Sequence, residues 1–489
     1  MINKLHFLTG ASRDSFFLII VKLVTASLGF VLTRLLADSL SIAQFGTYSQ
    51  AMLLVSTLVS LTILGMIDGT NYFFHHACSL ESKERYMSTI VFMQCLIGVV
   101  SGLMLLVFHE FIIRYFDNSA LKSLLLFTSA LPLLQNLISI LQIMFVAIGK
   151  ARQIAVRNLL ISISKLVLYF VACQVLKSLP AILLFTILLD LAQILYFTTV
   201  LNHNNCTVSV HKIDFSLMKP ILRYCIPMAA FIMINALSRD CDKYVISALT
   251  NTENLAVYAN ASKPLPFDII TGAYITVLVP YLTRYIAEQQ FEKARSLYRL
   301  LLEVSLLTTG IMAFASIVSA PMLMELLYTQ KYLSGINVFI VYTLVDIIRF
   351  LSMTLILAAA GKTKILVYLA TGSIAANFLL NLLLFRLMGT LGPAIATLLI
   401  LTLTGLIIQN CSASVLQCRL CDLFDWKRLL LFLAEALLLI PVFLILSRAL
   451  GELHYITRLL IVGGGYGLAL LALNLKRLFL CVRQIGEFR

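Results

Sequence analysis

The stretch YVISALTNTENLAVYANA, residues 244–261, repeats the pattern of RLLADSLSIAQFGTYSQA at residues 34–51. The alignment places Tyr258 on Tyr48 at an offset of 210. A second pair of segments, FVAIGKARQI at 145–154 and LAAAGKTKIL at 357–366, aligns at an offset of 212 and places one Gly-Lys pair on the other. Two anchors that agree within two residues indicate an internal duplication of the chain.

Long apolar runs surround these anchors. Of the 489 residues, 60% are hydrophobic and 12% are charged, and the mean hydropathy is +0.96. A helix needs about 20 apolar residues to cross the roughly 30 Å hydrocarbon core of a bilayer. The sequence therefore predicts an all-α membrane protein with fourteen transmembrane helices, at residues 15–37, 47–74, 86–108, 121–148, 154–176, 180–201, 220–249, 255–282, 297–328, 334–361, 364–386, 391–417, 428–447 and 455–475.

The placement of positive charge predicts the topology. With a cytoplasmic N-terminus, the 37 Lys and Arg residues divide into 23 in cytoplasmic segments, 7 in external connections and 7 within spans or at their margins. Such asymmetry is the positive-inside rule, and it predicts that both termini are cytoplasmic. No basic stripe interleaved with aromatic residues remains, so nucleic acid is not expected as a partner.

Duplication and span count together predict the domain organisation. An N-terminal six-helix lobe covers 1–201, a cytoplasmic linker covers 202–219, and a C-terminal six-helix lobe covers 220–417. Residues 418–489 supply two additional transmembrane helices and a cytoplasmic tail. Because six is even, the two halves enter the membrane from the same side, and a substrate site is expected between them.

The order and spacing of three blocks resemble the polysaccharide flippases of the Wzx type, in the superfamily of the lipid II flippase MurJ and the multidrug MATE exporters. These blocks are LGFVLTRLLADSLSIAQFGTYSQAMLLVSTLVSLTILGM at 28–66, YCIPMAAFIMINALSRDCDKYVISALTNTENLAVYANASK at 224–263 and LAAAGKTKILVYLATGSIAANFLLNLLLFRLMGTLGPAIAT at 357–397. The resemblance covers nearly the whole chain. One departure is a pair of acids, Asp240 and Asp242, late in the seventh span where relatives have one.

The resemblance implies a MATE-like, V-shaped fold around a cationic cavity in the bacterial inner membrane. It implies that oligosaccharide units linked to undecaprenyl pyrophosphate are flipped by alternating access, for O-antigen, capsule or another surface polysaccharide. It also implies a polysaccharide polymerase and a chain-length regulator as partners, besides membrane lipids. The protein is then a transporter and not an enzyme, with no cofactor and coupling to H⁺ or Na⁺.

Charges inside the spans are the candidate site residues, since a charge at bilayer depth costs roughly 2.5–3.5 kcal/mol and marks a functional or paired position. Lys22 precedes Arg34 by twelve residues, as two arginines do in the lipid II flippase. By this match Lys22 is a candidate for holding the pyrophosphate or a sugar acid, and the alternative is an ion pair with an acid of a neighbouring span. Lys263 lies where Pro264 and Pro266 predict a broken helix. The predicted cationic cavity comprises Lys22, Lys165, Arg239, Lys263 and Arg349.

Intramembrane acids are candidates for ion coupling or for structural pairing. Asp240 and Lys243 stand at i and i+3, as do Arg239 and Asp242, so both pairs could simply neutralise each other. Arg349 and Asp346 have the same spacing, which fits either a private pair or a cavity lining. Arg157 is expected to be an ordinary cytoplasmic-side cation. Asp268 lies just beyond the predicted break at Lys263. The remaining acids, Asp68, Asp190 and Glu435, lack an obvious partner in the sequence.

Two other functions are compatible with parts of the sequence. A cation-coupled drug or metabolite antiporter would have the same fold and a less cationic cavity. A membrane glycosyltransferase or polymerase would use Asp240 and Asp242 as a D-x-D metal motif, but such acids belong on sizeable external loops. Cys418 and Cys421 form a C-x-x-C without a second pair, so reduced thiols are expected there instead of a metal site.

Overall fold

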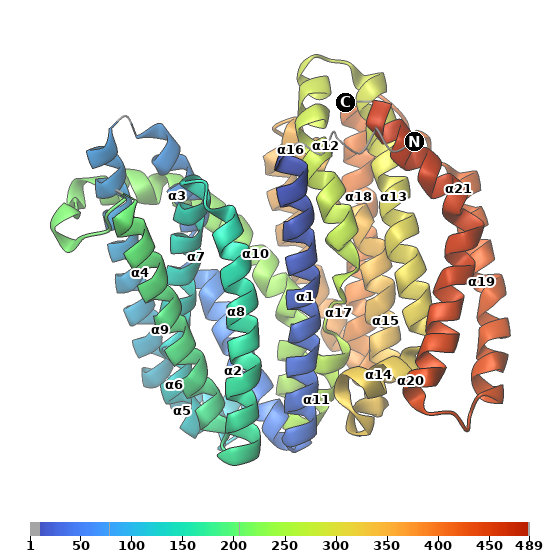
Figure 1. Ribbon diagram of the computed structural model, residues 1–489, viewed down its shortest axis with the longest axis horizontal. Helices are drawn as coiled ribbons and strands as arrows, with labels where there is room; N and C mark the ends of the chain where they lie inside the picture. Colours follow the sequence, from blue (N-terminus) through green and yellow to red (C-terminus); the bar gives the residue numbers. More distant parts are fainter. Residues whose placement is uncertain (1–9, 78, 205, 488–489) are drawn as a thin grey trace. The chain divides into compact units, whose positions relative to one another are not determined.

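The protein consists of two compact units, Met1–Ala256 and Val257–Arg489. The computed structural model describes residues 10–487 with the exception of 78 and 205. Every regular element of these residues is helical, and they contain no strand (Figure 1). The prediction of an all-α fold is therefore confirmed. The lobe and linker boundaries inferred from the duplication stay a prediction.

Unit 1 contains α1 to α10 and the first half of α11. Their bounds are α1 Gly10–Ser39, α2 Ile42–Thr62, α3 Met66–His76, α4 Leu80–Val107, α5 His109–Phe116, α6 Leu121–Thr128, α7 Leu131–Ala147, α8 Ala151–Phe170, η2 Val171–Val175, α9 Leu179–His203, η3 Val210–Lys212, η4 Phe215–Leu217 and α10 Met218–Leu249. Its core lies among α3, α4, α7 and α9 and is filled by Met87, Ile90, Met144, Phe145 and Phe197.

Unit 2 begins within α11 and holds the rest of the chain. Its elements are α11 Thr252–Ala261, η5 Pro266–Asp268, α12 Ile269–Ala287, α13 Phe291–Val318, α14 Ala320–Tyr328, η6 Gln330–Gly335, α15 Ile336–Ile348, η7 Arg349–Ser352, α16 Leu355–Ala359, α17 Thr363–Met388, α18 Leu391–Val415, η8 Leu420–Leu423, α19 Trp426–Ala449, α20 Tyr455–Arg458, η9 Leu459–Gly464 and α21 Gly465–Glu487. Helix α13 packs against α12, α15, α19 and α21 and is the centre of this unit.

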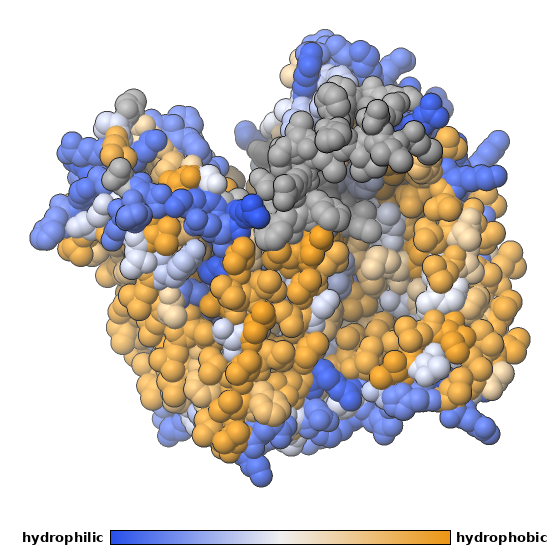
Figure 2. Space-filling model, viewed as in Figure 1, coloured by the Kyte–Doolittle hydropathy of each residue, from blue (hydrophilic) through white to orange (hydrophobic). Residues whose placement is uncertain are grey.

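Thirteen of the described helical segments are long and apolar enough to cross a membrane. The eighth of the fourteen predicted spans, 255–282, is the one without such a segment, and it falls on α11 and α12, which a break between Ala261 and Pro266 separates. Within each unit the surface in Figure 2 carries an apolar band along the helices, with hydrophilic residues gathered near the helix ends. This distribution fits helices that are surrounded by lipid.

The duplication is visible in the helix boundaries. Helices α2 and α11 start 210 residues apart, α4 and α13 start 211 apart, and both the pair α8 and α17 and the pair α9 and α18 start 212 apart. The caps agree as well, because the Ser41 hydroxyl accepts the Gln44 N–H at 3.1 Å and the Asn251 amide oxygen accepts the Asn254 N–H at 2.8 Å. Side-chain caps at equivalent positions define the same helix start in both halves.

Equivalent Gly-Lys turns precede α8 and α17. Gly149 has a φ of +78° and Gly361 a φ of +68°, which favour glycine because it has no Cβ. The Lys150 N–H bonds to Phe145 O and the Lys362 N–H to Leu357 O, both at 2.9 Å. These are the bonds of a helix that ends on a left-handed residue. The sequence alignment at this turn is thus matched by the same backbone conformation.

The first helices of the two halves pack differently. Helix α1 lies along α8, whereas its counterpart α10 packs against α2, α3 and α4, all within unit 1. The Gln174 amide donates a 2.8 Å bond to the Ser39 hydroxyl, so the C-terminal ends of α1 and of the helix formed by α8 and η2 meet. The two helices therefore run in the same direction.

Candidate functional site

The charged cluster of α10 is mostly paired. The Lys243 ammonium donates a 2.6 Å hydrogen bond to Asp240, as the i, i+3 spacing predicts. Arg239 lies 3.7 Å from the same carboxylate, and 67% of its side chain is exposed. Arg239 is thus the cation of this cluster that a ligand could reach most readily.

The other acid of the cluster points to a different side of α10. Two residues rotate a helix by about 200°, so Asp242 cannot share the environment of Asp240. Asp242 is 1% exposed. Tyr244 and Ser247 stand four and seven residues after Asp240 and therefore lie on its side of the helix. Tyr244 donates a 2.6 Å bond to Thr57 on α2, and Ser247 accepts a 3.2 Å bond from Gln50 on the same helix. The side of α10 that carries Asp240 is thus a polar interface with α2, and the D-x-D pair does not present two carboxylates to one metal ion.

The predicted helix break at Lys263 is present. Helix α11 ends at Ala261, residues 263–265 are not helical, and Pro264 and Pro266 cannot donate backbone hydrogen bonds. The backbone N–H of Leu265 is instead accepted by Asp346 at 3.2 Å. At an offset of 210 the counterpart of Lys263 is Leu53, which lies inside the unbroken helix α2. The break is therefore specific to the second half.

A cavity of about 180 Å³ adjoins this break within unit 2. Asp346 and Arg349 line it and also form an ion pair of 3.3 Å. The sequence left open whether these two residues pair with each other or line a cavity, and the structure shows that they do both. The Arg349 side chain is 46% exposed, while Asp346 is buried. Further lining comes from Leu265, Phe267, Thr271, Thr309 and Met353.

Lys263 itself is exposed beside the break. The side chain of the neighbouring candidate Asp268 lies outside the described residues. A cation exposed next to a non-helical segment can offer its charge and nearby backbone groups to an anion at once. Lys263 and Arg349 are the two predicted cavity cations of unit 2.

In unit 1, Lys165 and Asp190 come together on α8 and α9. Asp190 is buried and accepts a 2.9 Å bond from Gln193, and the Lys165 charge acts on it. Lys22 is exposed on α1. It stands 17 residues before Ser39, as Arg157 stands 17 before Gln174, so Lys22 and Arg157 lie at about the same depth, roughly 25 Å from the end where α1 and α8 meet.

The expectation for Arg157 is wrong. Its side chain is 8% exposed, not an ordinary interfacial cation. The guanidinium donates to Gln193 at 2.6 Å and to Gln142 at 2.9 Å, and lies 4.6 Å from the centre of the Phe197 ring. Neighbouring helices supply these partners, so no pattern within α8 alone could reveal the burial.

Two acids without obvious partners have neighbours in the structure. Asp68 is in the first turn of α3, where the helix dipole favours a negative charge, and acts electrostatically on Cys225 of α10. Glu435 of α19 accepts a 2.7 Å bond from Asn474 of α21. Asp68 is half-buried, so it keeps some access to a ligand or proton.

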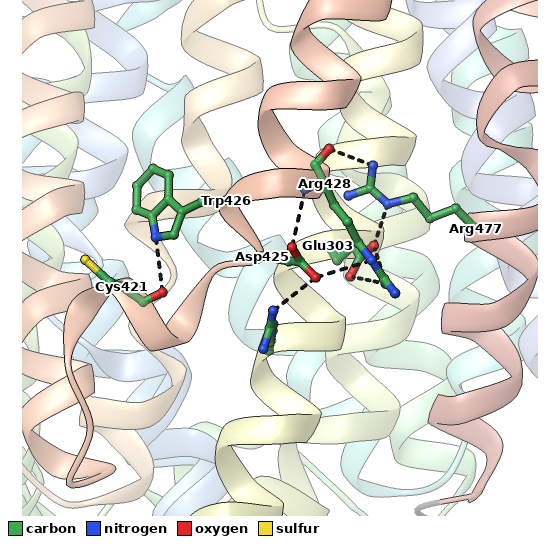
Figure 3. A network of polar contacts seen from close by, with 7 residues as sticks. Glu303, Cys421, Asp425, Trp426, Arg428 and Arg477 are labelled. Atoms are coloured by element: carbon green, nitrogen blue, oxygen red, sulfur yellow. Dashed lines mark hydrogen bonds and ion pairs between the residues drawn. The ribbon is translucent and has the colours of Figure 1, made fainter.

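A polar network missed from the sequence joins the additional helices to α13 (Figure 3). Glu303 of α13 accepts hydrogen bonds from Arg477 of α21 at 2.6 Å and from Arg428 of α19 at 3.2 Å. Asp425 caps α19 through the Arg428 N–H at 3.3 Å and pairs with Arg299 at 3.1 Å. An acid inside the apolar run 297–328 was the available signal. The pair α19 and α21 is thus an integral part of unit 2.

The fold is similar to those of transporters of the MOP superfamily. The lipid II flippase MurJ in an inward closed conformation matches with a TM-score of 0.73 and 17% identity, over 95% of this chain and 100% of that chain. A multidrug resistance MATE family transporter in an inward-facing conformation matches with a TM-score of 0.66 and 13% identity, over 81% of this chain and 94% of that one. A MOP superfamily transporter from Pyrococcus furiosus gives 0.59 and 12%, over 83% and 95%.

A comparison with protein families identifies the family to which the chain belongs. The model of the family described as "Polysaccharide biosynthesis protein" matches residues 31–337. This is more than half of the chain, so the protein belongs to that family. A search of the curated proteins gives no significant match. The resemblance inferred from the sequence is confirmed at this level.

Proposed function

We propose that the protein flips undecaprenyl-pyrophosphate-linked oligosaccharide units across the bacterial inner membrane by alternating access. The observation that carries this proposal is the combination of family and fold coverage. The family belongs to polysaccharide biosynthesis, and the likeness to a lipid II flippase extends over 95% of the chain, against 81–84% for the MATE transporters. The carrier-linked unit is an anionic lipid, which agrees with cations at bilayer depth.

The accessible cations support an anionic head group. Lys22, Arg239, Lys263 and Arg349 all have exposed side chains inside or beside spans. A pyrophosphate that leaves water needs such charges to replace part of its hydration. Lysines bind it as point charges rather than as rigid forks, which favours release after transport.

A vesicle assay tests the proposal. In protein-free vesicles, an added glycosidase reaches only the oligosaccharide of the outer leaflet. With the full chain reconstituted, we expect the inner-leaflet fraction to become accessible as well. In cells, we expect deletion of the gene to leave carrier-linked units on the cytoplasmic side. Unchanged accessibility with correctly folded protein contradicts the proposal.

The runner-up is a cation-coupled drug or metabolite antiporter, and the likeness to MATE transporters supports it. It predicts cation-driven efflux from the same vesicles without oligosaccharide movement. Growth of a drug-sensitive strain in the presence of the drug, when the protein is overexpressed, gives a second readout.

A further inference from the structure

Asp190 of unit 1 is a buried carboxylate with one unsatisfied oxygen. It stands 11 residues after Leu179 and 13 before His203, near the middle of α9. The residue is 3% exposed, and its Oδ1 accepts the Gln193 amide at 2.9 Å. Its Oδ2 has no hydrogen-bond partner within the described part of the chain. A charged oxygen without a partner is costly at bilayer depth, so this position favours an occupant that removes the charge.

Lys165 of α8 is the cation that faces Asp190. The Tyr169 hydroxyl of α8 bonds to the Thr186 hydroxyl of α9 at 2.7 Å, which fixes the register of the two helices. Lys165 precedes Tyr169 by four residues, and Asp190 follows Thr186 by four. Because α8 and α9 run antiparallel across a short connection, these equal steps of one turn place Lys165 opposite Asp190. The Lys165 charge acts on Asp190, although these two described residues form no direct ion pair.

Other titratable groups on the helices that pack against α9 do not take the place of this lysine. Helix α7 has no titratable side chain in residues 131–147, and α6 contributes Lys122, which is exposed. Cys173 of η2 lies about two turns from the level of Asp190. Arg157 also acts on Asp190, but neighbouring amides already hold its guanidinium.

The Lys165 ammonium, in contrast, has no hydrogen-bonded partner among the residues that the structure describes. The side chain is half-buried, so a ligand can reach it, whereas Asp190 is enclosed. The pair therefore combines an accessible cation with an inaccessible acid.

We propose that Asp190 is a proton-binding site and that Lys165 links its protonation to the binding of an anion. Without the proton, the carboxylate and the facing ammonium balance each other's charge across the helix pair. Transfer of one proton from water to Oδ2 gives a neutral carboxyl, which needs no further reactant and leaves the ammonium free to balance another negative charge.

Proton uptake and anion binding strengthen each other at this pair. An anion at Lys165 takes over the charge that balances the Asp190 carboxylate, and an uncompensated carboxylate at this depth favours its protonated form. By reciprocity, protonation of Asp190 increases the affinity of Lys165 for the anion by the same factor. The identity of the anion as the pyrophosphate of the carrier lipid rests on the proposed function, whereas the proton site does not.

Difference infrared spectroscopy of the full chain in nanodiscs tests the proton site. A protonated carboxyl has a carbonyl band that a carboxylate lacks, and we expect such a band to appear as the pH is lowered and to be absent in Asp190→Asn. Asparagine has nearly the same shape and keeps an oxygen for Gln193, and thermal melting checks that the variant is folded. Asp190→Glu should retain a titrating band. The matched control is Glu435→Gln, at another intramembrane acid bonded to an amide, which should leave the band in place.

A second measurement tests the link to Lys165. Undecaprenyl pyrophosphate is added to the same nanodiscs in weakly buffered solution, and a pH indicator records proton uptake. Relative to Asp190→Asn, we expect the parent to take up about one additional proton per bound lipid, because a single carboxylate is protonated. Lys165→Gln should lose this difference. Proton exchange by the pyrophosphate itself is common to all variants and cancels.

Two results overturn the proposal. Absence of any carboxyl band that changes with pH in the parent and is missing in Asp190→Asn excludes the proton site. Equal proton uptake per bound lipid in the parent and in Lys165→Gln excludes the link between the two residues. The infrared measurement requires no lipid substrate, so a failed vesicle assay together with an intact Asp190 band disproves flipping and leaves the proton site standing.

Discussion

The carboxylate of Asp346 accepts the backbone N–H of Leu265 across 81 positions of sequence, at 3.2 Å. One carboxylate on α15 thereby closes the helix break next to Lys263 and also pairs with Arg349. One backbone donor of the break is thus satisfied inside unit 2, as an irregular backbone at membrane depth requires.

We predict that Asp346→Ala lowers the free energy of unfolding by about 1–3 kcal/mol, because it leaves a buried N–H without an acceptor. Asp346→Asn keeps an acceptor and should be milder. Thermal melting of the purified protein in detergent measures both. Glu253→Gln on the exposed face of α11 is the control, and equal melting of Asp346→Ala and the control would contradict the prediction.

Lys263→Leu is expected to lower oligosaccharide flipping by about tenfold or more at unchanged protein level, as one contact to a charged group is lost. Leucine is the residue at the equivalent position of the first half, Leu53, so the side chain is compatible with a span. Lys263→Arg should retain most of the activity. Full flipping by Lys263→Leu would remove this residue from the site.

The pair of Asp240 and Lys243 predicts strong coupling in a double-mutant cycle. Lys243→Ala removes the 2.6 Å partner of a buried carboxylate, which Arg239 at 3.7 Å replaces only in part, and should cost up to about 3–5 kcal/mol. The double variant Asp240→Ala, Lys243→Ala should recover much of this loss. Arg239→Ala is the control, with an expected change within about 1 kcal/mol because its side chain is exposed. Additive effects of the two single substitutions would show that the contact is not coupled.

The segment between α9 and α10 predicts a pH dependence outside the membrane. The Ser216 hydroxyl and N–H donate to Asp214 at 2.6 and 2.9 Å, and together with the Arg85 ion pair they hold the pKa of Asp214 below its ordinary value of 3.8. A lowered pKa stabilises the folded segment at neutral pH, and this contribution is lost as the pH falls below about 4. Ser216→Ala removes the hydroxyl hydrogen bond, so the stabilisation by Asp214 should be lost at a higher pH.

The chain contains one tryptophan, so this transition can be followed by a single fluorophore. We suggest Val210→Trp, at an exposed site of the segment, in a Trp426→Phe background. Its emission should shift as acid loosens the contact to α4. Ser123→Ala on α6 is the control. A midpoint that Ser216→Ala leaves unchanged would show that these hydrogen bonds do not set the transition.

Glu303→Gln should loosen α19 and α21. The substitution removes the carboxylate that Arg428 and Arg477 share, and the Arg477 side chain is largely buried. Loss of one partner of a buried ion pair costs about 3–5 kcal/mol. Hydrogen exchange should rise in α19 and α21 and stay unchanged in α17 and α18. Asp425→Asn, at a more exposed carboxylate, should be milder, and a uniform rise across unit 2 would contradict the prediction.

The spans and the repeat could be predicted from the sequence because apolar run length and turn residues are local properties. Pro264 and Pro266 revealed the second-half break, whereas the end of α2 at Thr62 escaped notice, since Leu64 and Gly65 with positive φ carry no proline signal. The i, i+3 pair of Asp240 and Lys243 was likewise readable, as both residues share one helix.

Contacts between helices could not be predicted. The burial of Arg157, the closure of the break by Asp346 and the sharing of Glu303 by two arginines each depend on which helices become neighbours. Sequence spacing carries no information on that choice. Intramembrane charge identified important positions, and only the packing showed which of them are paired.

The steady drift of equivalent helix starts, from 210 to 211 and then 212 residues, records where the chain has tolerated insertions or deletions. The interval from the start of α11 to the start of α13 is one residue longer than the equivalent interval from α2 to α4. The interval from α14 to α17 is likewise one residue longer than that from α5 to α8. An indel inside a spanning helix would turn every later side chain by about 100°. Peptide tags or reporter sequences should accordingly be accepted best in the connections of these two intervals.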